Sequence, residues 1–198
     1  MGFPLGDGYH VLPPGKLAAV VTWLEMREPP KAGEGLPEGV ALIHDPEPEV
    51  SWYCRIFREI GEPWLWFGRL EMSAEELGKI LTAKGIEVYR LETGGDTIGL
   101  LEMDRRHPEE VEITYFGLVP GWTGRGVGKA LMAEALRQAW TPGTGRVWLH
   151  TCSFDHPGAV SFYQKCGFRP YQRGLEIFDD PRLRGVVRKD AAAQVPLL

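Results

Sequence analysis

The amino-terminal part of the chain alternates between short apolar runs and a stretch rich in proline and glycine. Leu17 to Met26 is apolar and β-branched, which predicts a first strand. The connection that follows is interrupted by prolines and glycines up to about residue 48, so we predict no continuous regular element there. Apolar residues then recur at helical spacing from Val50 to Ile60, and Ser73 with Glu76 forms a capping-box start, which predicts two helices before residue 85.

The rest of the chain is predicted to contain seven elements in the order strand, strand, strand, helix, strand, helix, strand. We expect them over residues 86–92, 97–103, 111–119, 126–140 (helix), 146–152, 157–166 (helix) and 172–178. A glycine pair, Gly94-Gly95, marks the hairpin between the first two of these strands. This order predicts a mixed α/β (α+β) fold.

Composition limits the classes of function. The chain has 198 residues, of which 43% are hydrophobic and 25% charged, as in a soluble globular domain. Its formal net charge of -5 argues against a general nucleic-acid binder and fits a cationic or neutral small partner better.

Targeting signals and metal motifs are not apparent. No apolar run approaches the roughly 20 residues that cross a bilayer, and residues 1–7 lack the basic and apolar regions of a secretory signal. Cys54, Cys152 and Cys166 are an odd set without metal-ligand spacing. We therefore expect a reduced, cytoplasmic protein with no metal site and no membrane partner.

A glycine-rich turn joins the strand that ends near residue 119 to the following helix. It reads Gly121-Trp-Thr-Gly-Arg-Gly-Val-Gly-Lys129. Glycine has no Cβ, so backbone amides can approach a ligand closely there. A helix start also presents unpaired N–H groups and the positive end of the helix dipole, to which Arg125 and Lys129 add formal charge. We therefore predict a site for an anionic ligand.

Two nucleotide-binding motifs fail on the residues that carry their mechanism. An ATPase phosphate loop needs glycine where Thr123 stands and a hydroxyl where Ala130 stands. A dinucleotide fingerprint needs glycine where Leu131 stands. ATP and NAD stay as ligands to test, and the glycines taken alone also permit a turn that binds nothing.

Two motifs follow each other about 40 residues apart. The first is Tyr115-Phe-Gly-Leu-Val-Pro followed by Gly124-Arg-Gly-Val-Gly-Lys, and the second is Ala159-Val-Ser-Phe-Tyr-Gln-Lys-Cys-Gly-Phe168, a helix ending in Tyr-x-x-x-Gly-Phe. They resemble motifs A and B of the GNAT N-acetyltransferase superfamily, and the helix near Trp52 with the run Trp64-Leu-Trp-Phe-Gly-Arg69 resembles its bacterial stand-alone branch. The resemblance covers the carboxyl two-thirds of the chain. It implies a mostly antiparallel sheet flanked by helices, with splayed strands at the cofactor site, and acetyl-CoA as co-substrate.

The length of the chain favours a single domain over residues 1–198, to whose parts the resemblance assigns roles. Residues 1–48 hold the first strand and its Pro/Gly-rich loop, 49–85 a helical acceptor-side segment, 86–180 the cofactor-binding and catalytic core, and 181–198 a C-terminal tail. Amides of the turn would hold the CoA pyrophosphate, and the splayed strand would pair with the pantetheine arm. Thr123 stands where Arg or Gln is usual, and His156 where Asn is frequent. The residues expected at the cofactor are Phe116, Leu118, Val119, Thr123, Gly124, Arg125, Gly126, Val127, Gly128, Lys129, His156 and Tyr163.

Acyl transfer from a thioester to an amine needs a neutral amine, a stabilised oxyanion and a protonated leaving thiolate. By resemblance, Glu112 is the base, directly or through water, with Glu110 on the same strand face in reserve. Tyr163 would protonate the thiolate, and the backbone N–H of Leu118 would bind the oxyanion. The structural alternatives are a solvent-facing strand residue for Glu112 and a core aromatic for Tyr163.

Cys152 supports a rival mechanism. His150 and Cys152 alternate on one strand face, so a thiol nucleophile activated by His150 or His156 could form an acyl-enzyme. A buried thiol is the commoner role of cysteine. A metal site built from these residues and Asp155 lacks the usual spacing, and Asp155 and His156 fit better as caps of the helix that follows.

Aromatic residues before position 70 are candidates for the acceptor pocket. Trp52, Trp64 and Trp66 could line it or pack in the core, and Trp64 and Trp66 share a face if their run is extended. Arg69 is expected to pair with an acidic group or a substrate carboxylate.

We therefore predict transfer of an acetyl group from acetyl-CoA to a primary amine in a ternary complex, with a non-catalytic acyl-CoA sensor of the same fold as the alternative. The acceptor, a small molecule or a peptide amine, is not specified by the sequence. The oligomeric state is left open, a homodimer included.

Overall fold

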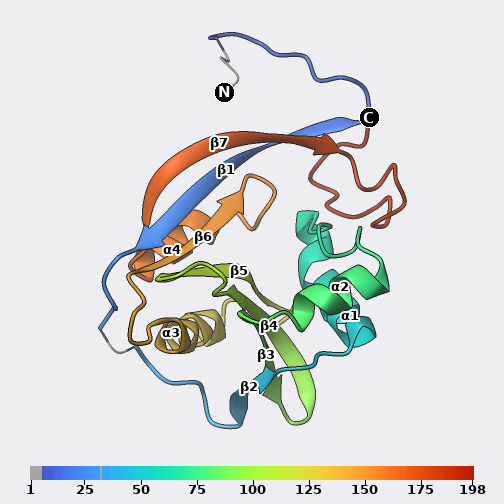
Figure 1. Ribbon diagram of the computed structural model, residues 1–198. Helices are drawn as coiled ribbons and strands as arrows, with labels where there is room; N and C mark the ends of the chain where they lie inside the picture. The colour runs from blue at the N-terminus through green and yellow to red at the C-terminus, as the bar shows by residue number, and fades with distance from the viewer. Residues whose placement is uncertain (1–5, 32) are drawn as a thin grey trace.

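The computed structural model describes residues 6–31 and 33–198 (Figure 1). Residues 1–5, on which part of the argument against a secretory signal depends, lie outside that range. The elements in chain order are β1 (Lys16–Met26), β2 (Val40–Asp45), α1 (Val50–Gly61), the 3-10 helix η1 (Glu62–Trp64), α2 (Ala74–Leu81), β3 (Ile86–Thr93), β4 (Asp96–Asp104), β5 (Glu110–Leu118), α3 (Val127–Ala139), β6 (Arg146–Cys152), α4 (Ala159–Lys165) and β7 (Arg169–Asp179).

The strands form one sheet in the order β2-β3-β4-β5-β6-β1-β7. Every neighbouring pair is antiparallel except β5 with β6, which is parallel. The mixed, mostly antiparallel sheet flanked by helices is therefore confirmed. The position of β1 between β6 and β7 is a long-range pairing that no local pattern predicts.

Most local signals correspond to the observed elements. Ser73 caps α2 with the full capping box, since its hydroxyl accepts from the N–H of Glu76 and the Glu76 carboxylate accepts from the N–H of Ser73. In contrast, β2 lies inside the Pro/Gly-rich connection, where we expected no regular element. It was missed because its apolar run, Val40 to Ile43, is only four residues long and lies among prolines and glycines, and because most side chains of this edge strand are exposed or half-buried.

Helices cover both faces of the sheet. Figure 1 shows α1 and α2 on one side and α3 on the other. Tyr53 and Phe57 of α1 are fully buried and pack with β4, whereas Met132 and Ala135 of α3 are buried in a second cluster on the other face. These two cores hold the strands rigidly on either side of the site described below.

The C-terminal segment, residues 180–198, has no helix or strand but is packed. Arg182 is 2% exposed and donates to the Asp180 carboxylate and to the backbone oxygens of Ala191 and Val195. Val187, Ala191 and Ala192 form a buried cluster with Leu65, which follows η1. The expected C-terminal tail is thus a structural support for the segment that follows α1.

No helix among residues 6–31 and 33–198 combines the length and apolar character needed to cross a membrane.

Candidate active site

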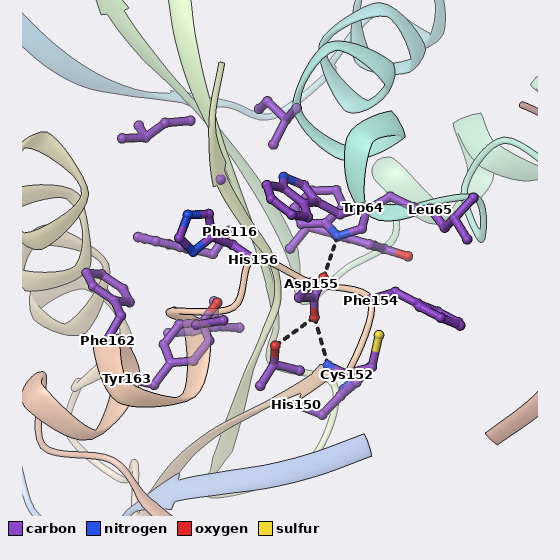
Figure 2. Close-up of a pocket in the computed structure, with 18 of the residues that line it drawn as sticks. Trp64, Leu65, Phe116, His150, Cys152, Phe154, Asp155, His156, Phe162 and Tyr163 are labelled. Carbon is purple, nitrogen blue, oxygen red and sulfur yellow. Dashed lines mark hydrogen bonds between the residues drawn. The ribbon is translucent and has the colours of Figure 1, made fainter. Parts of the chain in front are cut away.

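The two parallel strands at the centre of the sheet separate from each other. Pairing of β5 with β6 covers Glu110↔Arg146 to Glu112↔Trp148 and ends there. The later halves of both strands line a cavity of about 650 Å³. The glycine turn, α4, β7 and the segment around Trp64 complete its walls, and Figure 2 shows the labelled side chains converging on it.

The glycine turn is built for close approach of a ligand to the backbone. Gly121, Gly124 and Gly126 have φ of 90°, 77° and 80°, which side chains tolerate poorly. Gly126 is the N-cap of α3 and provides no side-chain cap. Within the described part of the chain, no hydrogen bond leaves the amides of residues 123–128. Free N–H groups at a helix N-terminus can bind an anion.

Charged side chains of the turn stay at its outer surface. Arg125 lies over the Trp122 ring, with 5.5 Å from its Cζ to the ring centroid. Lys129 is 68% exposed and lies 3.8 Å from Glu34. Thr123, Gly124 and Gly128 line the cavity itself.

The end of β5 presents both an apolar surface and a free amide to the cavity. Phe116 stacks on Phe162 of α4 at 5.8 Å between ring centroids. The N–H of Val119 donates to the carbonyl of Ile98 on β4. Because successive N–H groups of a strand point to opposite sides, the N–H of Leu118 points to the gap between β5 and β6. The side chain of Val119 is buried in the core.

Tyr163 reaches the cavity from α4. Its ring packs on Phe168, Phe162 and Phe116, and in Figure 2 its hydroxyl end points into the cavity. Burial raises the pKa of this hydroxyl above its usual value, with the charge of Asp155 acting in the same direction. The group therefore remains a proton donor at neutral pH.

Glu112 of β5 and His150 of β6 form a pair close to the point where these two strands separate. Nδ1 of His150 lies 3.5 Å from Oε1 of Glu112. His150 lines the cavity, whereas Glu112 is behind it and is absent from the described residues that line the cavity. The hydrogen bond with Glu112 raises the pKa of His150, against the effect of burial. Glu110 pairs with Arg146 at 3.2 Å instead.

Asp155 organises the loop that follows β6. One carboxylate oxygen accepts from the Thr151 hydroxyl at 2.6 Å and the Cys152 amide at 2.8 Å, and the other accepts from the Trp66 indole at 3.0 Å. Asp155 therefore does not cap α4 as expected, because its carboxylate is used by β6 and Trp66. His156 does bond the turn before α4, since its Nδ1 accepts from the Gly158 amide at 3.0 Å.

Cys152 lines the cavity but is not activated. Burial, together with the charge of Asp155, raises the pKa of its thiol to about 11. A nucleophilic cysteine needs a lowered pKa, so the environment opposes the acyl-enzyme mechanism. Across residues 6–31 and 33–198 no group of three or more His, Cys, Asp or Glu side chains could hold a metal ion.

The aromatic residues expected at the acceptor separate into two places. Trp64 and Trp66 line the cavity, although their run is not extended: Trp64 ends η1 and Leu65 has a left-handed φ of 56°. Trp52 is 8% exposed in the core, where its indole donates to Thr97.

Arg69 makes the internal ion pair that was one of its two predicted roles. It pairs with Glu102, which is fully buried and also accepts from the Tyr53 hydroxyl. Arg69 is absent from the described residues that line the cavity.

Some cavity residues were not predicted from the sequence. Phe67, Phe154, Phe178 and Glu176 all line it. Glu176 and Phe178 alternate on one face of β7, which was a visible signal. Their approach to the site depends on β1, which pairs Ala19 with Glu176 and carries β7 beside β6.

Known proteins resemble this chain in sequence. The sequence profile of the Acetyltransferase (GNAT) family matches residues 47–168. An uncharacterized N-acetyltransferase of Mycobacterium tuberculosis (strain ATCC 25618 / H37Rv) and one of Mycobacterium bovis are each 30% identical over 98 residues. Each match covers 50% of this chain and 62% of the relative, so less than two-thirds of the relative's length is spanned.

Solved structures share the fold. A putative acetyltransferase from the GNAT family of Novosphingobium aromaticivorans DSM 12444 aligns with a TM-score of 0.55 at 15% identity, over 86% of this chain and 70% of that one. A GCN5-related N-acetyltransferase from Sphaerobacter thermophilus aligns with a TM-score of 0.57 at 20% identity, over 84% and 52%. With the family profile matching more than half of its length, the chain belongs to the Acetyltransferase (GNAT) family.

Proposed function

We propose that the protein transfers an acetyl group from acetyl-CoA to a primary amine in a single ternary complex. The observation that carries this proposal is one cavity that extends from the free amides of the glycine turn to the pair formed by His150 and Glu112. The unpaired N–H groups of residues 123–128 open onto the same cavity as Tyr163 and His150. An anionic carrier can therefore be held at one end while its acyl group is presented at the other.

The donor would be held mainly by backbone. In this proposal the amides from Thr123 to Gly128 bind the pyrophosphate, with Arg125 and Lys129 contributing charge at the surface. The pantetheine arm would lie along Phe116 and Leu118, where β5 has lost its partner strand. Val119 would take no direct part, because its side chain is buried and its N–H donates to Ile98, whereas His156 lines the same cavity near the start of α4.

Proton transfer would begin at His150 and not at Glu112 directly. An alkylammonium ion has a pKa near 10.4, so the acceptor arrives charged and must lose a proton. Nε2 of His150 is the accepting atom, because Nδ1 faces Glu112. Glu112 thus positions the imidazole and stabilises its charged form, which is the role of a carboxylate behind a general base.

The remaining steps use groups already aimed at the cavity. The neutral nitrogen attacks the thioester carbonyl while the N–H of Leu118 donates to the developing oxyanion. As the C–S bond breaks, Tyr163 donates its hydroxyl proton to the sulfur. The second nitrogen proton restores the tyrosine. The products are the amide, the CoA thiol and one proton, which leaves through His150.

Calorimetry and a thiol assay test this proposal. Acetyl-CoA should bind with saturation, whereas ATP and NAD should not, and at least one primary amine should release CoA thiol. Absence of binding would overturn the proposal. Binding without thiol release from any amine in a broad panel would favour the non-catalytic acyl-CoA sensor.

Two substitutions test the assigned roles. His150→Ala and Tyr163→Phe should each lower kcat by about 10²-fold, because positioned acid–base groups contribute at least that much. Acetyl-CoA affinity should change little. Cys152→Ala is the matched control within the same cavity, and a comparable loss in that variant would restore the acyl-enzyme mechanism.

A further inference from the structure

The cavity wall opposite α4 is aromatic. Phe67 and Phe154 both lie against Phe178, with ring centroids 5.0 and 6.0 Å apart. Figure 2 shows Trp64 and Phe154 across the cavity from Tyr163. We call Phe67, Phe154 and Phe178 the aromatic wall. Rings in edge-to-face and tilted contact leave apolar surface suited to a further flat group.

The aromatic wall is held in place from behind. Phe67 and Phe154 pack against the cluster of Leu65, Val187 and Ala191. The C-terminal segment is in turn fixed there by bonds such as that from the Gln194 amide to the carbonyl of Pro63. A pocket supported in this way is formed before a ligand arrives, which lowers the entropy lost on binding.

One carboxylate beside the aromatic wall is free for a ligand. Glu176 lines the cavity two residues before Phe178, on the same face of β7. Among the described residues it has no ion pair or side-chain hydrogen bond, whereas Asp155 is engaged by Thr151 and Trp66. The charge of Glu176 reaches His150, whose pKa it helps to raise. A single uncommitted negative charge therefore faces the position where the amine must lose its proton.

We propose, on the basis of the function proposed above, that the acceptor is a monoamine with an aromatic or similarly flat apolar body. The ammonium group would lie between Glu176 and His150, and the ring would pack on the aromatic wall. This assignment follows from one free carboxylate next to a large apolar surface. Polyamines and aminoglycosides carry several charges, which an aromatic wall would desolvate without compensation. Aromatic carboxylates would be repelled by Glu176.

Binding measurements without turnover test the acceptor class. 2-Phenylethylamine, butylamine, spermidine and 3-phenylpropionate are titrated calorimetrically into the protein, with and without saturating CoA. 2-Phenylethylamine should bind at least about tenfold more tightly than the other three. Equal or tighter binding of spermidine, or of the carboxylate, would overturn the proposal. Failure to bind acetyl-CoA would instead reject the proposed function, and the titrations without CoA would still report on the aromatic wall.

Variants at Glu176 and Phe178 test separately how the carboxylate charge and the aromatic ring contribute to amine binding. Glu176→Gln should weaken 2-phenylethylamine binding about tenfold and leave binding of neutral 2-phenylethanol unchanged. Asp179→Asn is the matched control, because Asp179 lies on the other face of β7 in a pair with Lys16. Phe178→Leu should remove the preference for 2-phenylethylamine over butylamine. If the preference survives, or if Asp179→Asn has the same effect as Glu176→Gln, the proposed acceptor class is wrong.

Discussion

The two ends of the cavity are built in different ways. The donor end comes largely from one continuous stretch, the end of β5 with the glycine turn, and what it offers is backbone N–H groups. The acceptor end combines side chains from the segment after η1, the loop after β6 and strand β7, which are far apart in sequence. A backbone site can thus be formed by a local motif, whereas a side-chain site depends on how the whole sheet is assembled.

The two ends also differ in charge. The donor end has the start of α3 with Arg125 and Lys129, which suits an anion. The acceptor end has Glu176, and Glu112 behind His150, which suits a cation. In the proposed reaction, opposite charges would therefore distinguish the anionic donor from the cationic amine before shape does.

The largest effect that we expect follows from removing the support of the acceptor end. Arg182→Met leaves the Asp180 carboxylate buried without its partner, which should lower the free energy of unfolding by about 3 kcal/mol. Because the C-terminal segment supports Leu65 and the aromatic wall, KM for the amine should rise while the Kd for acetyl-CoA stays the same. Urea denaturation and initial-rate kinetics measure the two effects.

A surface pair of the same kind is the control for that variant. Arg188 pairs with Asp190 in the same segment and at the same spacing, but both side chains are about 70% exposed. Arg188→Met should change the free energy of unfolding by less than about 1 kcal/mol. Arg182→Met could instead lower the free energy of unfolding as little as Arg188→Met does, or weaken acetyl-CoA binding as much as amine binding. Either result would mean that the donor end and the acceptor end do not have separate structural supports.

The same contrast explains what could be predicted from the sequence. The capping box at Ser73 and the glycine turn are local arrangements whose residues encode their own geometry. The edge strand β2 has no such signal. The place of β1 between β6 and β7 depends on pairing across the whole chain, as in Val21↔Cys152, and with it the arrival of Glu176 at the cavity. His150 was visible in the sequence, but its contact with Glu112 requires two strands that are adjacent only in the fold.

A smaller effect is expected from distorting the donor end. Gly126→Val places a β-branched side chain at a φ of 80°, so the turn must change conformation and its amides lose their common direction. The Kd for acetyl-CoA should rise about tenfold, with KM for the amine unchanged at saturating donor. Gly143→Val imposes a similar strain, at a φ of 97°, in the loop between α3 and β6. A similar loss of acetyl-CoA affinity in both variants would mean that the effect is one of stability and not of the site.

The smallest expected effect, and the most specific, concerns the contact between His150 and Glu112. The hydrogen bond with Glu112 raises the pKa of His150, and only the neutral imidazole can accept a proton from the amine. Activity should therefore fall as the pH falls through this raised pKa. Glu112→Gln removes the charge that stabilises the protonated ring, so the ascending limb of kcat/KM should move to lower pH. The plateau at high pH should decrease only modestly, because His150 is still present but less well oriented.

Glu110→Gln is the control for this shift, because Glu110 is on the same strand but pairs with Arg146. Its pH profile should match that of the unaltered protein. A different result would identify Glu112 as the base itself: turnover would then drop about 10²-fold at every pH, with no ascending limb left to move. The two outcomes are distinguishable because a positioning carboxylate changes where the rate rises, whereas a catalytic one changes whether it rises at all. The shape of one pH profile thus decides whether the proton leaves through His150 or directly through Glu112.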